Sequence, residues 1–429
     1  MAVNSAQTVA EAVADSGAVL LLGAALIPLF RRVRQPRVMA EIVVGIMLGP
    51  SLLGLLPGDL TARLFPPAVR SDLSAVAEIS ILLFMFLIGW EMDLGQVRTR
   101  RGAVLGVSLS STAVPLGSGV VLAVLLYRDH DTLAGHHVGE PGFILFVGTA
   151  MAITAFPVLA RIIGEHRLQH TQVGTIALAS AAVGDVIAWC LLAVVSVVAA
   201  RGGLWHLLAL GGWCGLYATV LVLIVRPLLR IVIARLSPGG TPSPLLLTVL
   251  ASGAFLAGFA TQRIGLDAIF GAFSFGLVMP SDSRQDLAGV VRMPLQHITA
   301  LLLPVFFIST GLQVNLGGLG ISGLCQLAAI IAVASLGKVT GAFAAARVSG
   351  MSIRDSASIG LLMNTRGLTE LIVLNVGASM GVLDGQMFTM MVVMALVTTG
   401  MAGPLVPYGP RDGEGDEPIT ADQLVTTAR

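Results

Sequence analysis

Apolar residues fill this chain in long runs, and short polar or charged stretches separate one run from the next. Each run is about 20 residues long, which is the length that an α-helix needs to cross the hydrocarbon core of a bilayer. The runs lack the two-residue alternation of membrane-barrel strands. Since a bilayer leaves only helices and closed barrels as spanning structures, the pattern predicts an all-α polytopic membrane protein.

About thirteen such runs can be delimited, with ends good to several residues. They cover 17–33, 38–56, 72–92, 103–126, 143–163, 171–198, 205–228, 243–262, 265–280, 293–313, 320–345, 355–379 and 385–406. The runs predict a membrane domain over 1–406. The polar tail that follows, 407–429, is expected to be short, disordered and without a regulatory domain.

Arginines distribute unevenly over the predicted loops. If the N-terminus lies outside, the inner loops hold sixteen arginines and the outer loops hold five. Basic residues in short loops stay on the cytoplasmic side of a membrane. The chain is therefore predicted to lie in the cytoplasmic membrane with its N-terminus outside and its C-terminus in the cytoplasm.

The thirteen predicted spans divide into six, one and six. We expect one repeat over about 17–198, a linker helix at 205–228 and a second repeat over about 243–406. Because the first repeat starts outside and the second starts inside, the two repeats would be inverted. Inverted repeats with interrupted helices near the bilayer midplane are typical of secondary transporters.

The fifth helix of each repeat carries an interruption. In 143–163 it is Pro157, whose ring removes a backbone donor and clashes with the preceding turn. In 355–379 it is the polar segment that contains Asn364, Thr365 and Gly367. Interruptions at matching positions predict a pair of crossed broken helices.

The amino-acid composition further restricts what kind of membrane protein this chain is. Only 11% of the residues are charged, against about 25% in soluble proteins, and the net charge is +1. The near-neutral balance argues against a nucleic-acid partner, and the three cysteines fall in apolar runs rather than in a disulfide framework. Glycines four apart, at 45 and 49 and at 337 and 341, predict two helix faces that approach neighbours closely.

Ionisable residues deep in a membrane are rare and are usually functional. Asp185 lies in the middle of the sixth span, next in sequence to the first broken helix. A buried carboxylate that titrates in the neutral range can hold either a proton or a metal cation. We expect Asp185 to bind both in competition, with oxygen ligands from Thr154, from Ser180 and from carbonyls freed near Pro157. A role in helix packing alone is the weaker alternative, because burying a carboxylate is costly.

Lys338 is the only lysine in the chain and lies in the middle of the eleventh span. Two roles stay open for it: a counter-charge to Asp185 that itself titrates, or a fixed cation that neutralises half-helix ends. Arg366 and Glu370 are four residues apart and should share a helix face across the second break. Because arginine stays charged, that pair is expected to be a scaffold.

Other charged groups are expected to be less informative. Glu41, Glu78 and Asp267 lie nearer span ends, where a solvated carboxylate is favoured over an ion ligand. The histidine-containing segment 129–140 is interpreted as a wet polar loop rather than a metal site or a pH sensor.

Ordered motifs along residues 17–406 resemble the monovalent cation:proton antiporter-2 family, and most closely the membrane domain of plant cation/proton exchangers and their bacterial relatives. The motifs are RQPRVMAEIVVGIMLGPSLLG, LLFMFLIGWEMDL, AITAFPVLARII, AVGDVIAW, GLDAIFGAFSFGLVMP, LLLPVFFISTGL, GKVTG and LMNTRGLTELIVLNVG. The resemblance implies an elevator mechanism beside a dimerisation domain, and hence a homodimer. It also implies Asp185 as carrier of ion and proton, Thr154 as a ligand and Lys338 as the core lysine.

Two positions depart from the family pattern. Many relatives have Asp-Asp or Asn-Asp where this chain has Gly184-Asp185, so Lys338 lacks its usual partner. One carboxylate suits one-for-one exchange, whereas a lysine that titrates would add a proton. Asp267 stands where relatives often carry histidine.

The sequence thus predicts an antiporter of Na⁺ or K⁺ against H⁺ that needs no cofactor. An exporter of an organic ion or ionophore–cation complex on the same scaffold is the alternative. A channel or sensor would need a continuous pore or a signalling domain. A membrane hydrolase is disfavoured because the spans contain no HExxH motif and no serine–histidine pair.

Overall fold

The computed structural model describes residues 17, 21–30, 32, 35, 37–55, 65–91, 101–133, 136–168, 171–199, 204–237, 242–280 and 287–406. Helices account for almost all of them, together with one short hairpin of β1 (Thr132–Leu133) and β2 (His136–His137). The predicted tail 407–429 lies outside the described residues. The helices are Leu21–Phe30, α2 (Arg37–Leu48), α4 (Pro67–Glu91), α5 (Arg101–Leu126), α6 (Glu140–Ala152), α7 (Phe156–Glu165), α8 (Gln172–Ala199), α9 (Leu204–Val220), α10 (Arg226–Arg235), α11 (Leu245–Ile264), α12 (Ala268–Leu277), α13 (Met293–Gly311), α14 (Gly320–Val348), α15 (Ile353–Met363), α16 (Leu368–Ser379) and α17 (Gly385–Leu405).

The helices have the lengths and composition of membrane spans. In the part of the chain that is described, eight are long and apolar enough to cross a bilayer, and five shorter apolar helices accompany them. Leucine, valine and isoleucine side chains remain exposed on the outer faces of several helices, such as Leu125 on α5 and Leu223 between α9 and α10. The predicted all-α membrane fold is therefore confirmed, while the count of thirteen spans stays a prediction.

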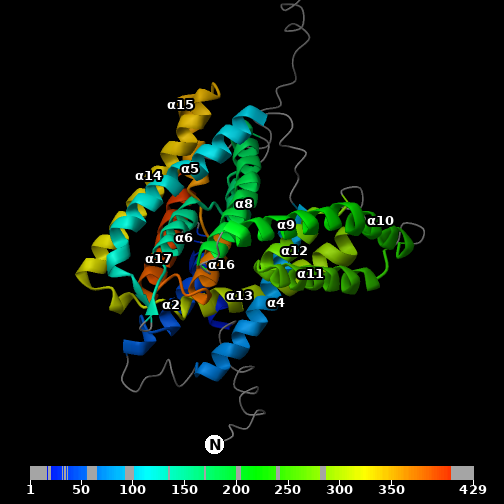
Figure 1. Ribbon diagram of the computed structural model, residues 1–429, viewed down its shortest axis with the longest axis horizontal. Coiled ribbons are helices and arrows are strands. Elements are labelled where there is room, and N and C mark those ends of the chain that lie inside the picture. Colours follow the sequence, from blue (N-terminus) through cyan, green and yellow to red (C-terminus); the bar gives the residue numbers. More distant parts are fainter. Residues whose placement is uncertain are drawn as a thin grey trace, which may run out of the picture.

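Packing sorts the helices into two groups (Figure 1). In the first, α4 packs on α12 and α13, α13 packs on α2, and α11 packs on α12. In the second, α5 packs along α14, α6 and α8, α14 also packs on α15 and α17, and α16 packs on α17 and α6. Figure 1 shows α5, α14 and α17 on one side of the view and α10, α11 and α12 on the other. We call the first set of packed helices the α4–α13 group and the second set the α5–α14 group.

The two glycine pairs lie where helices approach most closely. A Cβ atom at Gly45 would collide with the backbone of Ile308 on α13, and one at Gly341 would collide with the backbone of Ser110 on α5. Such contacts let the backbones come together without intervening side chains. The prediction of two close-packing glycine faces is confirmed, one within each group.

Both broken helices are present, and their extended segments cross. The first break separates α6 from α7 at residues 153–155, and the second separates α15 from α16 at residues 364–367. The backbone N–H of Ala155 donates to the carbonyl of Thr365 over 3.1 Å, which joins the two segments directly. Gly367 has a φ of 148°, a conformation that residues with a Cβ rarely adopt.

Pro157 does not lie in the break itself, contrary to the prediction. It occupies the first turn of α7, after the extended residues have ended. The first turn of a helix has no intrahelical partner for its N–H groups, so proline is well tolerated there. The break therefore precedes the proline, and Pro157 starts the second half-helix.

Candidate functional site

Two buried cations hold the carbonyl end of α6. The Arg366 guanidinium donates to the carbonyls of Ala150 and Met151, over 2.9 Å and 2.6 Å. The Lys338 ammonium donates to the carbonyl of the next residue, Ala152. The last carbonyls of a helix have no intrahelical donors and carry the negative end of its dipole. Two positive side chains thus satisfy three consecutive carbonyls where α6 stops inside the molecule.

Arg366 also pairs with Glu370. A guanidinium nitrogen lies 3.0 Å from one carboxylate oxygen of Glu370, and both side chains are fully buried. The prediction that these residues share a helix face is confirmed. Removing one member of a buried pair leaves an uncompensated charge. Glu370 therefore balances the Arg366 guanidinium, whose hydrogen bonds to Ala150 and Met151 join the second break to α6.

Asp185 lies in the middle of α8 with 1% of its surface exposed. Neither carboxylate oxygen has a hydrogen-bond partner among the described residues. The backbone amide of Phe156, at the start of α7, and the ammonium of Lys338 are close enough to act on its charge. A helix N-terminus carries positive partial charge. The carboxylate therefore faces the positive end of one half-helix, and its oxygens are left free to bind a proton or a cation.

The predicted ligands Thr154 and Ser180 are buried but bonded elsewhere. Thr154 lies in the extended segment between α6 and α7, and its hydroxyl donates to the carbonyl of Met363 over 3.4 Å. The Ser180 hydroxyl donates to the carbonyl of Val104 on α5 over 3.2 Å. Thr154 is thus at the crossing of the two segments, while Ser180 ties α8 to α5. Their role as ion ligands stays a prediction.

The second break supplies oxygens that the sequence did not single out as ligands. The side-chain oxygens of Asn364 and Thr365 are buried and have no hydrogen-bond partner among the described residues. The sequence identified both residues only as breakers of the helix. The signal that could have identified them as ligands is their polarity inside an apolar span. A buried oxygen without a hydrogen-bond donor is costly unless it binds something.

Two adjoining cavities lie on the side of the crossing that the sequence predicts to face outside. Their volumes are about 390 Å³ and about 360 Å³, and Asp267 and Gln262 line both. Glu78 on α4 lines the larger cavity. Trp189, one helical turn after Asp185 on α8, lines the smaller one. The two cavities, which carboxylates line, therefore come within about one helical turn of Asp185.

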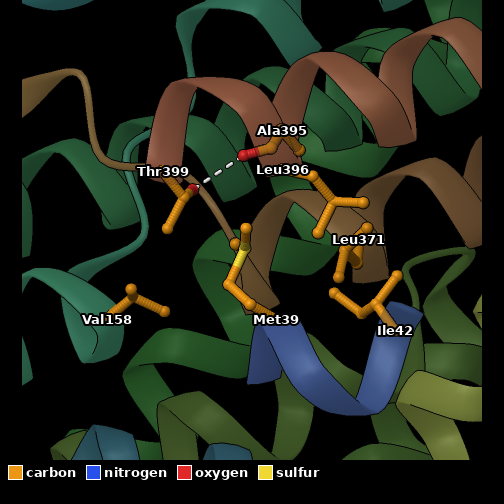
Figure 2. A pocket seen from close by; sticks show the side chains of 8 residues that line it. Met39, Ile42, Val158, Leu371, Ala395, Leu396 and Thr399 are labelled. Atoms are coloured by element: carbon orange, nitrogen blue, oxygen red, sulfur yellow. Dashed lines mark hydrogen bonds between the residues drawn. The ribbon is translucent and has the colours of Figure 1, made fainter. Parts of the chain in front are cut away.

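Apolar side chains fill the opposite contact between α2 and the crossing. Figure 2 shows Met39 and Ile42 of α2 facing Val158, Leu371 and the α17 residues beside Thr399. The remaining space is only about 10 Å³, roughly enough for one water molecule. A hydrated ion therefore has no room in this contact.

The three carboxylates that were expected to be less informative lie in three different environments. Glu78 is exposed, as expected. Asp267 caps the N-terminus of α12 by accepting from the backbone N–H of Ile269 over 3.0 Å, which gives it a structural role. Glu41 is buried, so the expectation of a solvated carboxylate is wrong there, because α2 packs into the interior rather than at a wet surface.

The expectation of a wet loop at 129–140 is wrong for His130. This imidazole is 1% exposed and lies 2.6 Å from the Asp384 carboxylate. The loop folds inward because Asp384, at the start of α17, offers a charged partner. No group of three metal-ligating side chains occurs among the described residues.

Comparison with known proteins places this geometry in a family. The family model described as "Sodium/hydrogen exchanger, transmembrane" matches residues 18–408. The chain belongs to this exchanger family. Among its relatives, Na(+)/H(+) antiporter NhaS4 of Synechocystis sp. is 36% identical over 380 residues, which are 88% of this chain and 92% of that protein.

Two further relatives in the exchanger family are longer proteins. Cation/H(+) antiporter 20 of Arabidopsis thaliana is 38% identical over 88% of this chain and 46% of its own length. K(+)/H(+) antiporter 1 of Saccharomyces cerevisiae is 32% identical over 90% of this chain and 45% of its own length. The chain thus spans about half the length of these plant and yeast relatives.

A solved structure shares the fold. The sodium proton antiporter MjNhaP1 from Methanocaldococcus jannaschii superposes with a TM-score of 0.64 over 92% of this chain and 95% of that one. At 16% identity the likeness concerns the fold alone. The family resemblance inferred from the sequence motifs is confirmed by the family model and by the named relatives.

Proposed function

We propose that this exchanger-family protein is a secondary active antiporter that exchanges a monovalent cation, Na⁺ or K⁺, for H⁺. The observation that carries the proposal is Asp185, a buried carboxylate in the middle of a membrane helix whose oxygens have no side-chain hydrogen-bond partner among the described residues. A proton neutralises such a group, and so does an alkali cation. Since the two cannot occupy it together, each one displaces the other, and this competition couples their movements. The protein is a transporter rather than an enzyme.

The surroundings of the site support alternating access. The cavities come within about one helical turn of Asp185 on one side, and an apolar contact with α2 lies on the other side. Movement of the α5–α14 group against the α4–α13 group would exchange the open and closed sides. Because Asp185 and Lys338 both belong to the α5–α14 group, the ion would travel with that group, as in an elevator mechanism.

Charge balance supports one-for-one exchange. Gly184 adds no second acid beside Asp185, and Lys338 is engaged by the carbonyl of Ala152. Arginine-rich inner loops support a cytoplasmic-membrane location with the N-terminus outside. The names of the relatives, which include a Na(+)/H(+) and a K(+)/H(+) antiporter, support both cations as candidates. A homodimer is part of the proposal on the family resemblance.

Liposomes that contain the purified protein and a pH-sensitive dye test this function. Addition of Na⁺, K⁺, Li⁺ or Rb⁺ in turn should collapse an imposed pH gradient for the transported cation. Asp185→Asn should abolish that response, and Glu140→Gln, which alters an exposed carboxylate outside both cavities, should retain it. A normal response from Asp185→Asn would refute the site. If no alkali cation acts on the wild-type protein, the same assay with organic cations tests the alternative substrate class.

A further inference from the structure

Ser108 on α5 is a buried hydroxyl without a use in the fold. It has no exposed surface, and its Oγ has no hydrogen-bond partner among the described residues. A serine inside a helix commonly donates to the carbonyl four residues earlier. For Ser108 that carbonyl belongs to Val104, and the hydroxyl of Ser180 already donates to it. The Ser108 hydroxyl is therefore left unsatisfied in the interior, which is costly unless it binds something.

The Ser108 hydroxyl faces α8 at Gly184. Apart from the local backbone of α8, a Cβ atom built on Gly184 would have Ser108 Oγ as its one neighbour within 4 Å among the described residues, at 4.0 Å. Gly184 immediately precedes Asp185, and α5 packs along α8. The missing side chain at residue 184 thus leaves space between an unsatisfied hydroxyl and the α8 backbone, one residue away from a carboxylate whose oxygens are also unsatisfied.

Two neighbouring hydroxyls of α5 behave differently. Ser111 and Thr112 are also buried, but both donate to the carbonyl of Ser108, over 3.2 Å and 2.8 Å. They satisfy themselves within the helix, whereas Ser108 does not. The hydroxyls of Ser111 and Thr112 therefore stabilise α5 through hydrogen bonds, whereas the Ser108 hydroxyl could bind a ligand.

We propose that Ser108 is a ligand of the transported alkali cation, bound in the space beside Gly184 together with Asp185. Alkali cations are hard ions that take oxygen ligands, and a hydroxyl supplies one without adding charge. The glycine at residue 184 gives the hydroxyl of α5 access to the cation. This inference rests on the proposed exchange and adds to it a determinant of cation affinity.

Ser108→Ala tests the inference, with Ser111→Ala as its matched control on the same helix. Exchange in liposomes is measured as a function of Na⁺ and of K⁺ concentration. We expect Ser108→Ala to raise the half-saturating cation concentration about tenfold, since one ligand to a charged group is lost. The maximal rate should change by less than about twofold. Ser108→Thr, which keeps the hydroxyl, should restore the half-saturating concentration.

The outcomes separate this inference from the proposed function. If the wild-type protein exchanges cations but Ser108→Ala matches Ser111→Ala, the ligand role is refuted and the antiporter function stands. If the wild-type protein exchanges no alkali cation, the function fails and the inference fails with it. If Ser108→Ala does not fold, Ser108→Cys replaces it, because a thiol of similar size is a poor ligand for hard cations. An unchanged half-saturating concentration in Ser108→Cys would refute the role equally.

Discussion

Lys338 is the residue whose role the sequence left most open, and its contact now restricts that role. The ammonium donates to the carbonyl of Ala152, directly after the two carbonyls that Arg366 binds. The Lys338 side chain therefore satisfies a carbonyl at a half-helix end, as the second of the two predicted roles requires. Lys338 also acts electrostatically on Asp185, so one side chain stabilises the end of α6 and lies beside the carboxylate of the proposed site.

Replacing the lysine should weaken the fold measurably. Lys338→Met removes the donor to Ala152 and leaves a buried carbonyl unsatisfied, which should lower the free energy of unfolding by about 1–3 kcal/mol. The melting temperature of the detergent-solubilised protein measures the effect. Arg354→Ala, at an exposed position of α15, is the control and should melt like the wild type. Equal melting of Lys338→Met and wild type would show that the contact contributes nothing.

At the scale of helices, the ends of three elements meet at His130. One ring nitrogen lies 2.6 Å from a carboxylate oxygen of Asp384, and the other lies 3.1 Å from the amide oxygen of Gln326 on α14. The amide nitrogen of Gln326 donates to Asp129 over 2.7 Å, which orients its oxygen toward the ring. Both ring nitrogens therefore face acceptors, and only the doubly protonated imidazolium can donate to both.

This arrangement makes the junction sensitive to pH. Burial lowers the pKa of His130, but the hydrogen bond and charge of Asp384, with Gln326 and Asp129, outweigh burial and leave the pKa above its ordinary value. Burial raises the pKa of Asp384, but the hydrogen bond and charge of His130, together with hydrogen bonds from the backbone amides of Met387 and Gln386, outweigh burial and leave that pKa below its ordinary value. A raised histidine pKa means that the folded state holds the proton more tightly than the unfolded state. The stabilisation is present below the unfolded pKa and is lost as pH rises through the folded one.

His130→Gln should therefore be destabilising in a pH-dependent way. Its melting temperature should fall furthest below that of the wild type near pH 6, at about the ordinary histidine pKa. The gap should narrow as pH rises and the wild-type imidazolium loses its proton. His137→Gln, whose side chain is 75% exposed, is the control from the same loop. A gap that stays constant across the pH range would exclude the charged pair as its cause.

At the scale of the whole molecule, a few polar contacts bridge the two helix groups. Asn375 on α16 donates to the Thr310 hydroxyl on α13 over 3.0 Å, and it accepts from the Gln313 amide over 3.2 Å. All three residues line the larger cavity. If the groups move against each other, these bonds must break, so Asn375 holds the arrangement seen here.

A reversible bridge at this contact should stop transport. After serine replaces Cys190, Cys214 and Cys325, the pair Thr310→Cys with Asn375→Cys is treated with mercury(II), which links two thiols. Cation-driven proton exchange should be lost and should return when excess dithiol removes the metal. The pair Asp129→Cys with Gln326→Cys joins side chains that bond within the α5–α14 group and should leave exchange largely intact. Full exchange with the first bridge closed would refute movement between the groups.

The sequence by itself determined the features of this protein that depend on local interactions along the chain. A bilayer requires helices of about 20 apolar residues, so the membrane class and the spans follow from hydrophobic runs alone. Pro157 and the polar segment at 364–367 indicated the two interrupted helices, and the few ionisable residues inside the runs indicated the buried groups Asp185, Lys338, Arg366 and Glu370. The motif order also identified the family. None of this depends on which helices touch.

Only the tertiary structure decided which polar atoms are satisfied. The partner of Lys338 depends on other helices, and so does the lack of a partner for the Asp185 oxygens and the Ser108 hydroxyl in the described part of the chain. His130 illustrates the same limit, because its burial depends on Asp384, which lies 254 residues away. Spacing along one helix gives no information about distances between helices. The chemistry of the site is therefore set by packing, while its residue types are set by sequence.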